Sequence, residues 1–149
     1  MIEFRRAGWE DCELLFRWRN DPMTRKHSFN PEALAEAEHR KWFAASVQDD
    51  RRILLLACAD SKVVGVLRFD LLDAPLRTAE VSIYVDPERH GQGLGKEILK
   101  GVEAWLKENT EIERLHAKVM QDNRPSVEIF KGCGFRQKYI LFEKELSRR

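Results

Sequence analysis

A strand, a glycine-rich turn and an amphipathic helix follow one another directly between residues 79 and 106. The strand alternates between apolar and polar side chains, with Ala79, Val81, Ile83 and Val85 on one side and Glu80, Ser82 and Tyr84 on the other. The helix carries an apolar stripe of helical period, made of Leu94, Ile98, Val102, Trp105 and Leu106. These two apolar faces predict a helix packed on a sheet, which is an α/β architecture.

The turn reads His90, Gly91, Gln92, Gly93, Leu94, Gly95, Lys96. Its glycines leave backbone N–H groups uncovered at the start of a helix, where the helix dipole places about half a positive elementary charge. Such a terminus binds phosphate groups. The turn therefore predicts a site for a phosphorylated cofactor.

Two common phosphate-binding motifs do not fit this turn. A P-loop ends in Gly-Lys-Ser/Thr, whereas Gly95 and Lys96 are followed by Glu97, which has no hydroxyl for magnesium. A dinucleotide-binding fingerprint has the spacing Gly-x-Gly-x-x-Gly and follows the first strand of its unit. Neither an ATP site nor a dinucleotide site is indicated.

The rest of the chain reads as short strands and helices. We expect strands at residues 2–6, 53–59, 63–72, 79–85, 115–119 and 139–146, and helices at residues 9–20, 31–47, 94–106 and 123–133. Residues 24–31 are expected to be irregular. The predicted order is β-α-α-β-β-β-α-β-α-β, an α+β arrangement with a mixed sheet. A chain of 149 residues without a linker predicts a single domain over residues 1–149.

The composition of the chain argues against several kinds of binding partner. The formal net charge of +1 argues against nucleic acid held by bulk charge, and no apolar run is long enough to span a membrane. Cys12, Cys58 and Cys133 form no CxxC pair, so neither a disulfide framework nor a metal site is indicated. With no signal-peptide pattern at the start, these features predict a cytoplasmic protein.

Two segments together resemble the signatures of the GNAT N-acetyltransferase superfamily. The first is residues 79–99, and the second, residues 123–135, begins at Asn123 and closes with Gly134 and Phe135. They stand in the superfamily's order, and the element order resembles it over nearly the whole chain. The resemblance implies acetyl-CoA as the cofactor and direct acetyl transfer to an amine. It implies a cofactor site made of Ile83, Tyr84, Val85, His90, Gly91, Gln92, Gly93, Leu94, Gly95, Lys96, Asn123, Ser126 and Phe130.

The chain departs from the superfamily pattern at two positions. His90 stands where Arg or Gln is usual, a change that a loop binding through backbone N–H groups tolerates. Phe130 stands where many relatives have the tyrosine that protonates the leaving thiolate. The general acid is therefore open. Tyr139 is one alternative donor, and a strand tyrosine with its ring in the core is the other interpretation.

Glu80 is the candidate general base, because it shares a strand face with Ser82 and Tyr84. A carboxylate needs burial or a relaying water to take a proton from an ammonium group. The alternative is a surface carboxylate paired with Arg68 or Arg77.

The acceptor is predicted from the first two helices. Pieces of both resemble GNAT enzymes that acetylate nucleotide-linked 4-amino sugars, as in the pseudaminic-acid pathway. The implied substrate residues are Trp18, Arg19, Asn20, His39 and Trp42. Core roles for the tryptophans and for His39 stay open. Three functions follow: acetylation of a small amine such as an amino sugar, acetylation of a protein N-terminus or a polyamine, or a non-catalytic CoA-binding module. The oligomeric state is left as monomer or homodimer.

Overall fold

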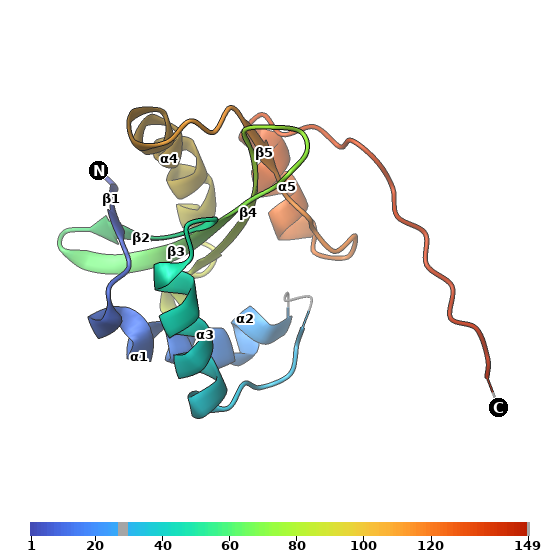
Figure 1. Ribbon diagram of the computed structural model, residues 1–149, viewed down its shortest axis with the longest axis horizontal. Coiled ribbons are helices and arrows are strands. Elements are labelled where there is room, and N and C mark those ends of the chain that lie inside the picture. Colours follow the sequence, from blue (N-terminus) through green and yellow to red (C-terminus); the bar gives the residue numbers. More distant parts are fainter. Residues whose placement is uncertain (27–29, 149) are drawn as a thin grey trace.

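A five-stranded mixed sheet lies between two layers of helices in the computed structural model (Figure 1), which describes residues 1–26 and 30–148. The strands are β1 (Glu3–Arg6), β2 (Arg52–Ala59), β3 (Lys62–Leu71), β4 (Thr78–Val85) and β5 (Arg114–His116). They lie in the order β1-β2-β3-β4-β5, with antiparallel pairs up to β4 and a parallel β4–β5 pair. The predicted mixed sheet is confirmed.

The helices divide between the two faces of the sheet. The first layer holds the 3-10 turn η1 (Trp9–Asp11), α1 (Cys12–Asn20), α2 (Pro22–Lys26) and α3 (Glu36–Gln48). The other layer holds α4 (Leu94–Asn109) and α5 (Arg124–Gly132), and a second 3-10 turn, η2 (Pro87–Arg89), follows β4.

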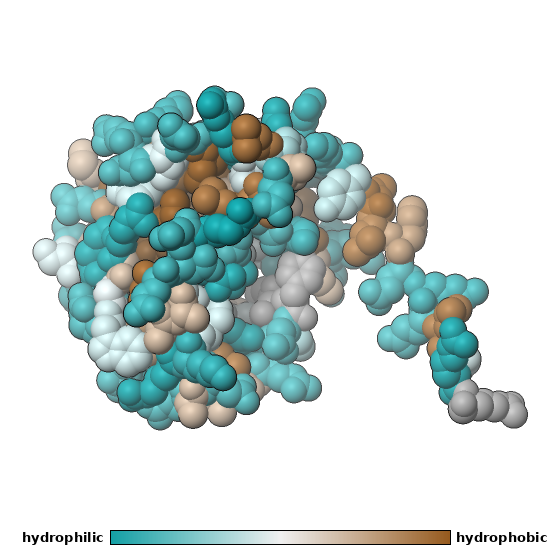
Figure 2. All heavy atoms as spheres, viewed as in Figure 1, coloured by the Kyte–Doolittle hydropathy of each residue, from teal (hydrophilic) through white to brown (hydrophobic). Residues whose placement is uncertain are grey.

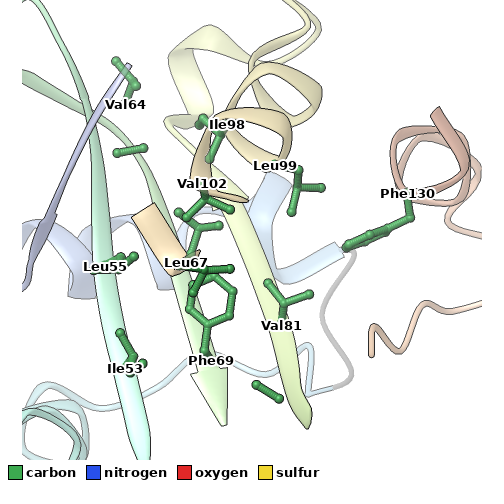
Figure 3. Packing of buried hydrophobic residues seen from close by; sticks show 13 residues of the cluster. Ile53, Leu55, Val64, Leu67, Phe69, Val81, Ile98, Leu99, Val102 and Phe130 are labelled. Atoms are coloured by element: carbon green, nitrogen blue, oxygen red, sulfur yellow. The ribbon is translucent and has the colours of Figure 1, made fainter. Parts of the chain in front are cut away.

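Strand β2 explains why both faces are covered. Its continuous apolar run places Ile53, Leu55 and Ala57 in the core under α4, shown with Phe130 of α5 in Figure 3. Leu54 and Leu56 point the other way, into a second core with α1 and α3. A strand buried on both faces has no polar side to alternate with, as the sequence predicts.

The hairpin and the strand β4 also follow the sequence. Asp60 and Ser61 adopt positive φ values of 50° and 67°, which suit a two-residue turn that keeps the strand twist. Ala79, Val81, Ile83 and Val85 contribute to the core under α4, whereas Tyr84 lies on the α1–α3 side. The alternation predicted for this strand is confirmed.

The second helix begins later than predicted, at Glu36 instead of residue 31. The side chain of Asn20 explains the delay, because its amide donates to the C=O of Leu34 and accepts from the N–H of Leu34, each at 2.8 Å. Those two bonds hold Leu34 outside the helix. Helix α2 also occupies residues 24–26 of the stretch expected to be irregular, and residues 27–29 of that stretch lie outside the described residues.

The prediction of a final strand at residues 139–146 is wrong. Residues 136–148 have no regular secondary structure and are exposed, and they extend away from the body (Figure 1). Tyr139 is 67% exposed, so the interpretation of its ring as a core residue is wrong. A strand needs a partner for its backbone groups, and this segment lies beside none in the described chain.

No helix of the described residues is both long and apolar enough to cross a bilayer.

Candidate active site

The turn after β4 directs an open loop toward the start of α4. Asp86 caps η2 by accepting a hydrogen bond from the N–H of Glu88 at 3.0 Å. Gly91 and Gly93 then take φ values of +82° and +77°, a left-handed conformation that costs other L-residues about 1–2 kcal/mol. Gly93 is the N-cap residue of α4, so the chain reverses into the helix at this glycine.

This loop fits a phosphate group. The N–H groups of Leu94, Gly95 and Lys96 lie in the first turn of a 16-residue helix, where no helical carbonyl accepts from them. A Cβ atom built on Gly91 or Gly93 would have no heavy atom within 4 Å, so the space in front of the loop is open. His90 and Gln92 are exposed beside it. Open space, free N–H groups and the positive end of a helix dipole together suit the pyrophosphate of a coenzyme.

Helix α5 lies directly against this loop. A Cβ atom on Gly95 would come within 3.1 Å of Ile129, so glycine at this position allows the two helices to approach closely. Asn123 caps α5 by accepting from the N–H of Ser126 at 3.3 Å. The predicted start of this helix is confirmed, and its later residues Ile129 and Gly132 contact the start of α4.

Phe130 lies in the core instead of an open cleft. It is 9% exposed and packs edge-to-face on Phe135, with the ring centroids 5.0 Å apart. Figure 3 shows its ring pointing from α5 toward the sheet. This ring packs helix α5 onto the domain, and it carries no group that donates a proton.

Strand β4 is paired on both sides only in its first half. The β4–β5 ladder joins Thr78–Glu80 to Arg114–His116 and goes no further. Beyond it, the edge of β4 that carries Ile83, Tyr84 and Val85 faces no strand in the described chain. Backbone groups on such an edge are available to an extended ligand, as in strand addition.

Glu80 lies at the end of this ladder, half-buried on the polar face of β4. Its carboxylate is 3.4 Å from the Nζ of Lys118. The two partners considered from the sequence are engaged elsewhere: Arg77 pairs with Glu113 at 2.9 Å, and Arg68 pairs with Asp70 at 3.0 Å. The carboxylate of Glu80 is therefore held by a long, largely exposed ion pair, which contributes little to stability.

A row of polar side chains crosses the same face of the sheet. Asp70 accepts a hydrogen bond from Arg52 and forms an ion pair with the Nε of Arg68 at 3.0 Å, and Arg68 also donates to the hydroxyl of Ser82 at 3.3 Å. The Arg52 guanidinium stands over the ring of Trp42, 5.8 Å from its centroid. This row was not predicted from the sequence, because its contacts depend on the register between the three strands β2, β3 and β4. Arg68 and Asp70, two residues apart in one strand, were its only sequence signal.

Tyr84 lies beside this row. Burial raises the pKa of its hydroxyl, and the positive charges of Arg19 and Arg68 oppose that rise. The hydroxyl therefore stays protonated at neutral pH and remains a donor. Because Arg19 comes from α1 and Arg68 from β3, two elements bring positive charge to one point on the β4 face.

The other predicted substrate residues are used mainly within the protein. Trp18 and His39 are 8% and 2% exposed, and Asn20 holds the backbone of Leu34. Trp42 is half-buried against the core formed by α1 and α3. Arg19 donates to the C=O of Asn30 at 2.8 Å through one nitrogen, while its Nη1 is buried with no hydrogen-bond partner among the described residues.

His39 is neutral in this setting. Burial lowers its pKa, the positive charge of Arg19 lowers it further, and a hydrogen bond to the C=O of Cys12 opposes both. Its Nε2 lies 3.2 Å from that carbonyl oxygen, which fixes the proton on Nε2. The ring also packs against Phe16 and Trp42, so His39 serves the core.

A surface hollow of about 240 Å³ lies on the outer side of the α1–α3 layer, lined by residues that include Trp9, Glu13, His39 and Arg40. None of the glycine-loop residues lines it. Its lining supplies three carboxylates and one guanidinium, so its charge does not match the pyrophosphate of a coenzyme.

Comparison with known proteins agrees with this geometry. Residues 2–136 match the family model described as an acetyltransferase (GNAT) domain. The acetyltransferase PseH of Campylobacter jejuni is 24% identical over 132 residues, which cover 89% of this chain and 81% of PseH. Among solved structures, spermidine N-acetyltransferase from Vibrio cholerae, in complex with CoA and spermine, is 17% identical. That match covers 97% of this chain and 86% of the other, with a TM-score of 0.84.

An aminoglycoside acetyltransferase AAC(6')-Ib, solved with coenzyme A and kanamycin, has a TM-score of 0.80 at 14% identity, covering 93% of this chain and 86% of the other. These structures confirm the predicted fold. The family match also confirms the predicted enzyme class, an N-acetyltransferase, and its cofactor, acetyl-CoA. The chain belongs to the GNAT family of acetyltransferases.

Proposed function

We propose that this acetyltransferase acetylates the primary amine of a nucleotide-linked amino sugar. The observation that carries the proposal is the pair of guanidinium groups, Arg19 on α1 and Arg68 on β3, whose positive charges both act on the hydroxyl of Tyr84. Guanidinium groups match the oxygen geometry of a diphosphate and stay charged at all relevant pH values. The buried Nη1 of Arg19, which has no partner among the described residues, is a donor that such an anion satisfies.

The cofactor's place in this proposal follows from the loop and the open strand edge. Acetyl-CoA, when bound, supplies an activated acetyl group as a thioester. The N–H groups of residues 91–96 would hold its pyrophosphate, and Asn123 would contact its extended arm. A backbone N–H of Ile83, Tyr84 or Val85 donates to the thioester oxygen, on which negative charge develops during attack.

Glu80 removes the proton of the acceptor amine in this proposal. It lies on the same face of β4 as Tyr84, at the end of the paired half of the strand. Because it is only half-buried, a water molecule can relay the proton to its carboxylate. Phe130 cannot donate to the leaving thiolate, and because burial raises the pKa of Tyr84, its hydroxyl offers the thiolate a hydrogen bond and not a proton.

The charge on the Tyr84 face of the sheet favours a nucleotide-linked sugar over a polyamine as the acceptor. This face carries Arg19, Arg52, Arg68 and Lys118 against the carboxylates of Asp70 and Glu80, so its positive charges outnumber its negative ones. A polycation such as spermidine is repelled there, whereas a nucleoside diphosphate is attracted. The similarity to PseH supports the same choice of acceptor.

The cellular setting is part of the proposal. Cys12, Cys58 and Cys133 are free thiols in the structure, which suits a reducing compartment. We place the enzyme in the cytoplasm, as one domain over residues 1–149.

A thiol-release assay tests the acceptor. Acetyl-CoA is held constant while the acceptor is varied among a uridine-diphosphate-linked amino sugar, the same amino sugar without its nucleotide, a peptide with a free N-terminus, and spermidine. We expect the highest kcat/KM for the nucleotide-linked sugar. Faster turnover of spermidine or the peptide contradicts the proposal, and binding of acetyl-CoA without CoA release above background for any acceptor favours the non-catalytic CoA-binding role.

The variant Arg19→Gln identifies the anion contact. One charge-assisted hydrogen bond contributes about 1.5–3 kcal/mol, so KM for the nucleotide-linked sugar should rise about 10- to 100-fold. KM for the free amino sugar should stay unchanged. Arg17→Gln, on an exposed position of the same helix, is the matched control.

A further inference from the structure

Strand β5 leaves one edge of the sheet uncovered. It is the last strand in the order and pairs only with β4 among the described residues. Its other edge therefore carries backbone N–H and C=O groups that no described strand satisfies. Edges of this kind accept an added strand.

The C-terminal segment carries an unusual concentration of exposed apolar side chains. Over residues 139–146, five of them are between 65% and 88% exposed: Tyr139, Ile140, Leu141, Phe142 and Leu146. Figure 2 shows hydrophobic side chains along this segment, which stands clear of the body. An exposed apolar cluster of this extent marks an interaction surface.

The two faces of β5 and its continuation differ sharply in character. Leu115, Ala117 and Val119 pack against the core under α4. The alternate positions hold Arg114, His116 and Lys118, and Lys118 pairs with Glu80 on the opposite face. His116 also has a buried Nε2 without a hydrogen-bond partner among the described residues.

The C-terminal segment is complementary to this pattern when it is extended. On one side it carries Ile140, Phe142 and Leu146, with Lys144 between the last two, and these apolar side chains match the apolar side of β5. On the other side it carries Glu143 and Glu145, which match the cations Arg114 and Lys118. A strand placed beside β5 therefore brings three apolar side chains to the core side and two carboxylates to the cationic side, where Tyr139 and Leu141 also lie.

The position of the segment favours an edge on another molecule. Phe135 is anchored against Phe130, and from there the chain runs away from its own β5 (Figure 1). We propose that residues 139–146 of one chain add as a strand to the outer edge of β5 in a second copy of this chain. Reciprocal exchange of the two segments closes a symmetric dimer.

The mass of the protein in solution tests the exchange. By size-exclusion chromatography with light scattering, we expect a dimer for the full chain and a monomer for a chain that ends at Gln137. Phe142→Asp should also be monomeric. Leu76→Asp changes an equally exposed leucine in the β3–β4 connection and should leave the dimer intact. A monomeric full chain, or a dimer that survives the truncation, overturns the proposal.

A charge-swap experiment tests whether the C-terminal segment pairs with β5 of a second copy or with β5 of its own chain. The variant Glu143→Lys/Glu145→Lys and the variant Arg114→Glu/Lys118→Glu each place like charges across the interface, so each should be monomeric alone. Mixed together, they should form a one-to-one heterodimer, because both exchanged contacts then regain opposite charges. If each variant keeps the wild-type mass and mixing changes nothing, the segment does not pair between copies.

Discussion

At the scale of single residues, Glu80 combines three properties that a proton acceptor needs. It is partly shielded from water, its ion pair to Lys118 is loose at 3.4 Å, and it shares a strand face with Tyr84. A carboxylate in a tight, structural ion pair is less free to take a proton. We therefore propose Glu80 as the carboxylate on this face whose removal affects catalysis and not folding.

Replacing this carboxylate should slow the reaction without unfolding the protein. We expect Glu80→Gln to lower kcat/KM by about 10²-fold or more at neutral pH, the usual contribution of a positioned base. The loss should shrink as pH rises, because more of the acceptor amine is then already neutral. Glu113→Gln removes a carboxylate from a comparable surface ion pair and should keep the wild-type profile. A pH–rate profile that is the same in Glu80→Gln and wild type removes Glu80 from the mechanism.

At the scale of elements, one buried ion pair fastens β1 to the start of the α1 layer. Asp11 is 6% exposed and accepts two hydrogen bonds from Arg5, both at 2.9 Å, and one from the N–H of Gly8 at 2.8 Å. Burial alone raises the pKa of Asp11, but these bonds from Arg5 and Gly8 outweigh it and hold the pKa below its ordinary value. The ionised form is thus the form that the fold stabilises.

This ion pair predicts a pH-dependent stability. Because the folded-state pKa is the lower one, the stabilisation is present above the pKa of the unfolded chain, about 3.9, and is lost as pH falls through the folded value. Asp11→Asn should lower the free energy of unfolding by about 1–3 kcal/mol at pH 7, and the difference from wild type should shrink in acid. Urea denaturation at several pH values measures it. Asp73→Asn, whose side chain is 93% exposed in its pair with Arg51, should change little, and an equal loss in both variants contradicts this account.

The same elements show how far the sequence carries a prediction. The apolar run of β2, the alternation of β4 and the N-cap at Asn123 are local patterns, and each produced the element expected. The start of α3 was predicted wrongly because it depends on a long-range contact. The side chain of Asn20 forms two hydrogen bonds with the backbone of Leu34, fourteen residues later. The polar row formed by Arg52, Asp70, Arg68 and Ser82 was not predicted for a similar reason. Its contacts depend on the register between three strands, and the sequence of a single strand does not determine that register. Burial of Trp18 and His39 was among the open interpretations, but only packing decides it.

At the scale of the whole molecule, the two helical layers carry different parts of the candidate site on opposite faces of the sheet. The α4–α5 layer holds the glycine loop, and the α1–α3 layer brings Arg19 to the opposite, polar face of β4. The uncovered half of β4 lies between these two sides. In the function proposed above, cofactor and acceptor approach one strand from different sides, which suits direct transfer between them.

The central claim is that the loop at the start of α4 holds the pyrophosphate of acetyl-CoA, and titration calorimetry tests it most directly. We expect saturable binding of acetyl-CoA to the wild-type chain. Gly93→Ala should weaken it at least about tenfold, because a Cβ atom enters the open space and strains a residue at φ +77°. Gly134→Ala imposes comparable strain at φ +91°, outside the loop, and should bind as wild type. Absence of saturable binding, or equal affinity in wild type and Gly93→Ala, contradicts the claim.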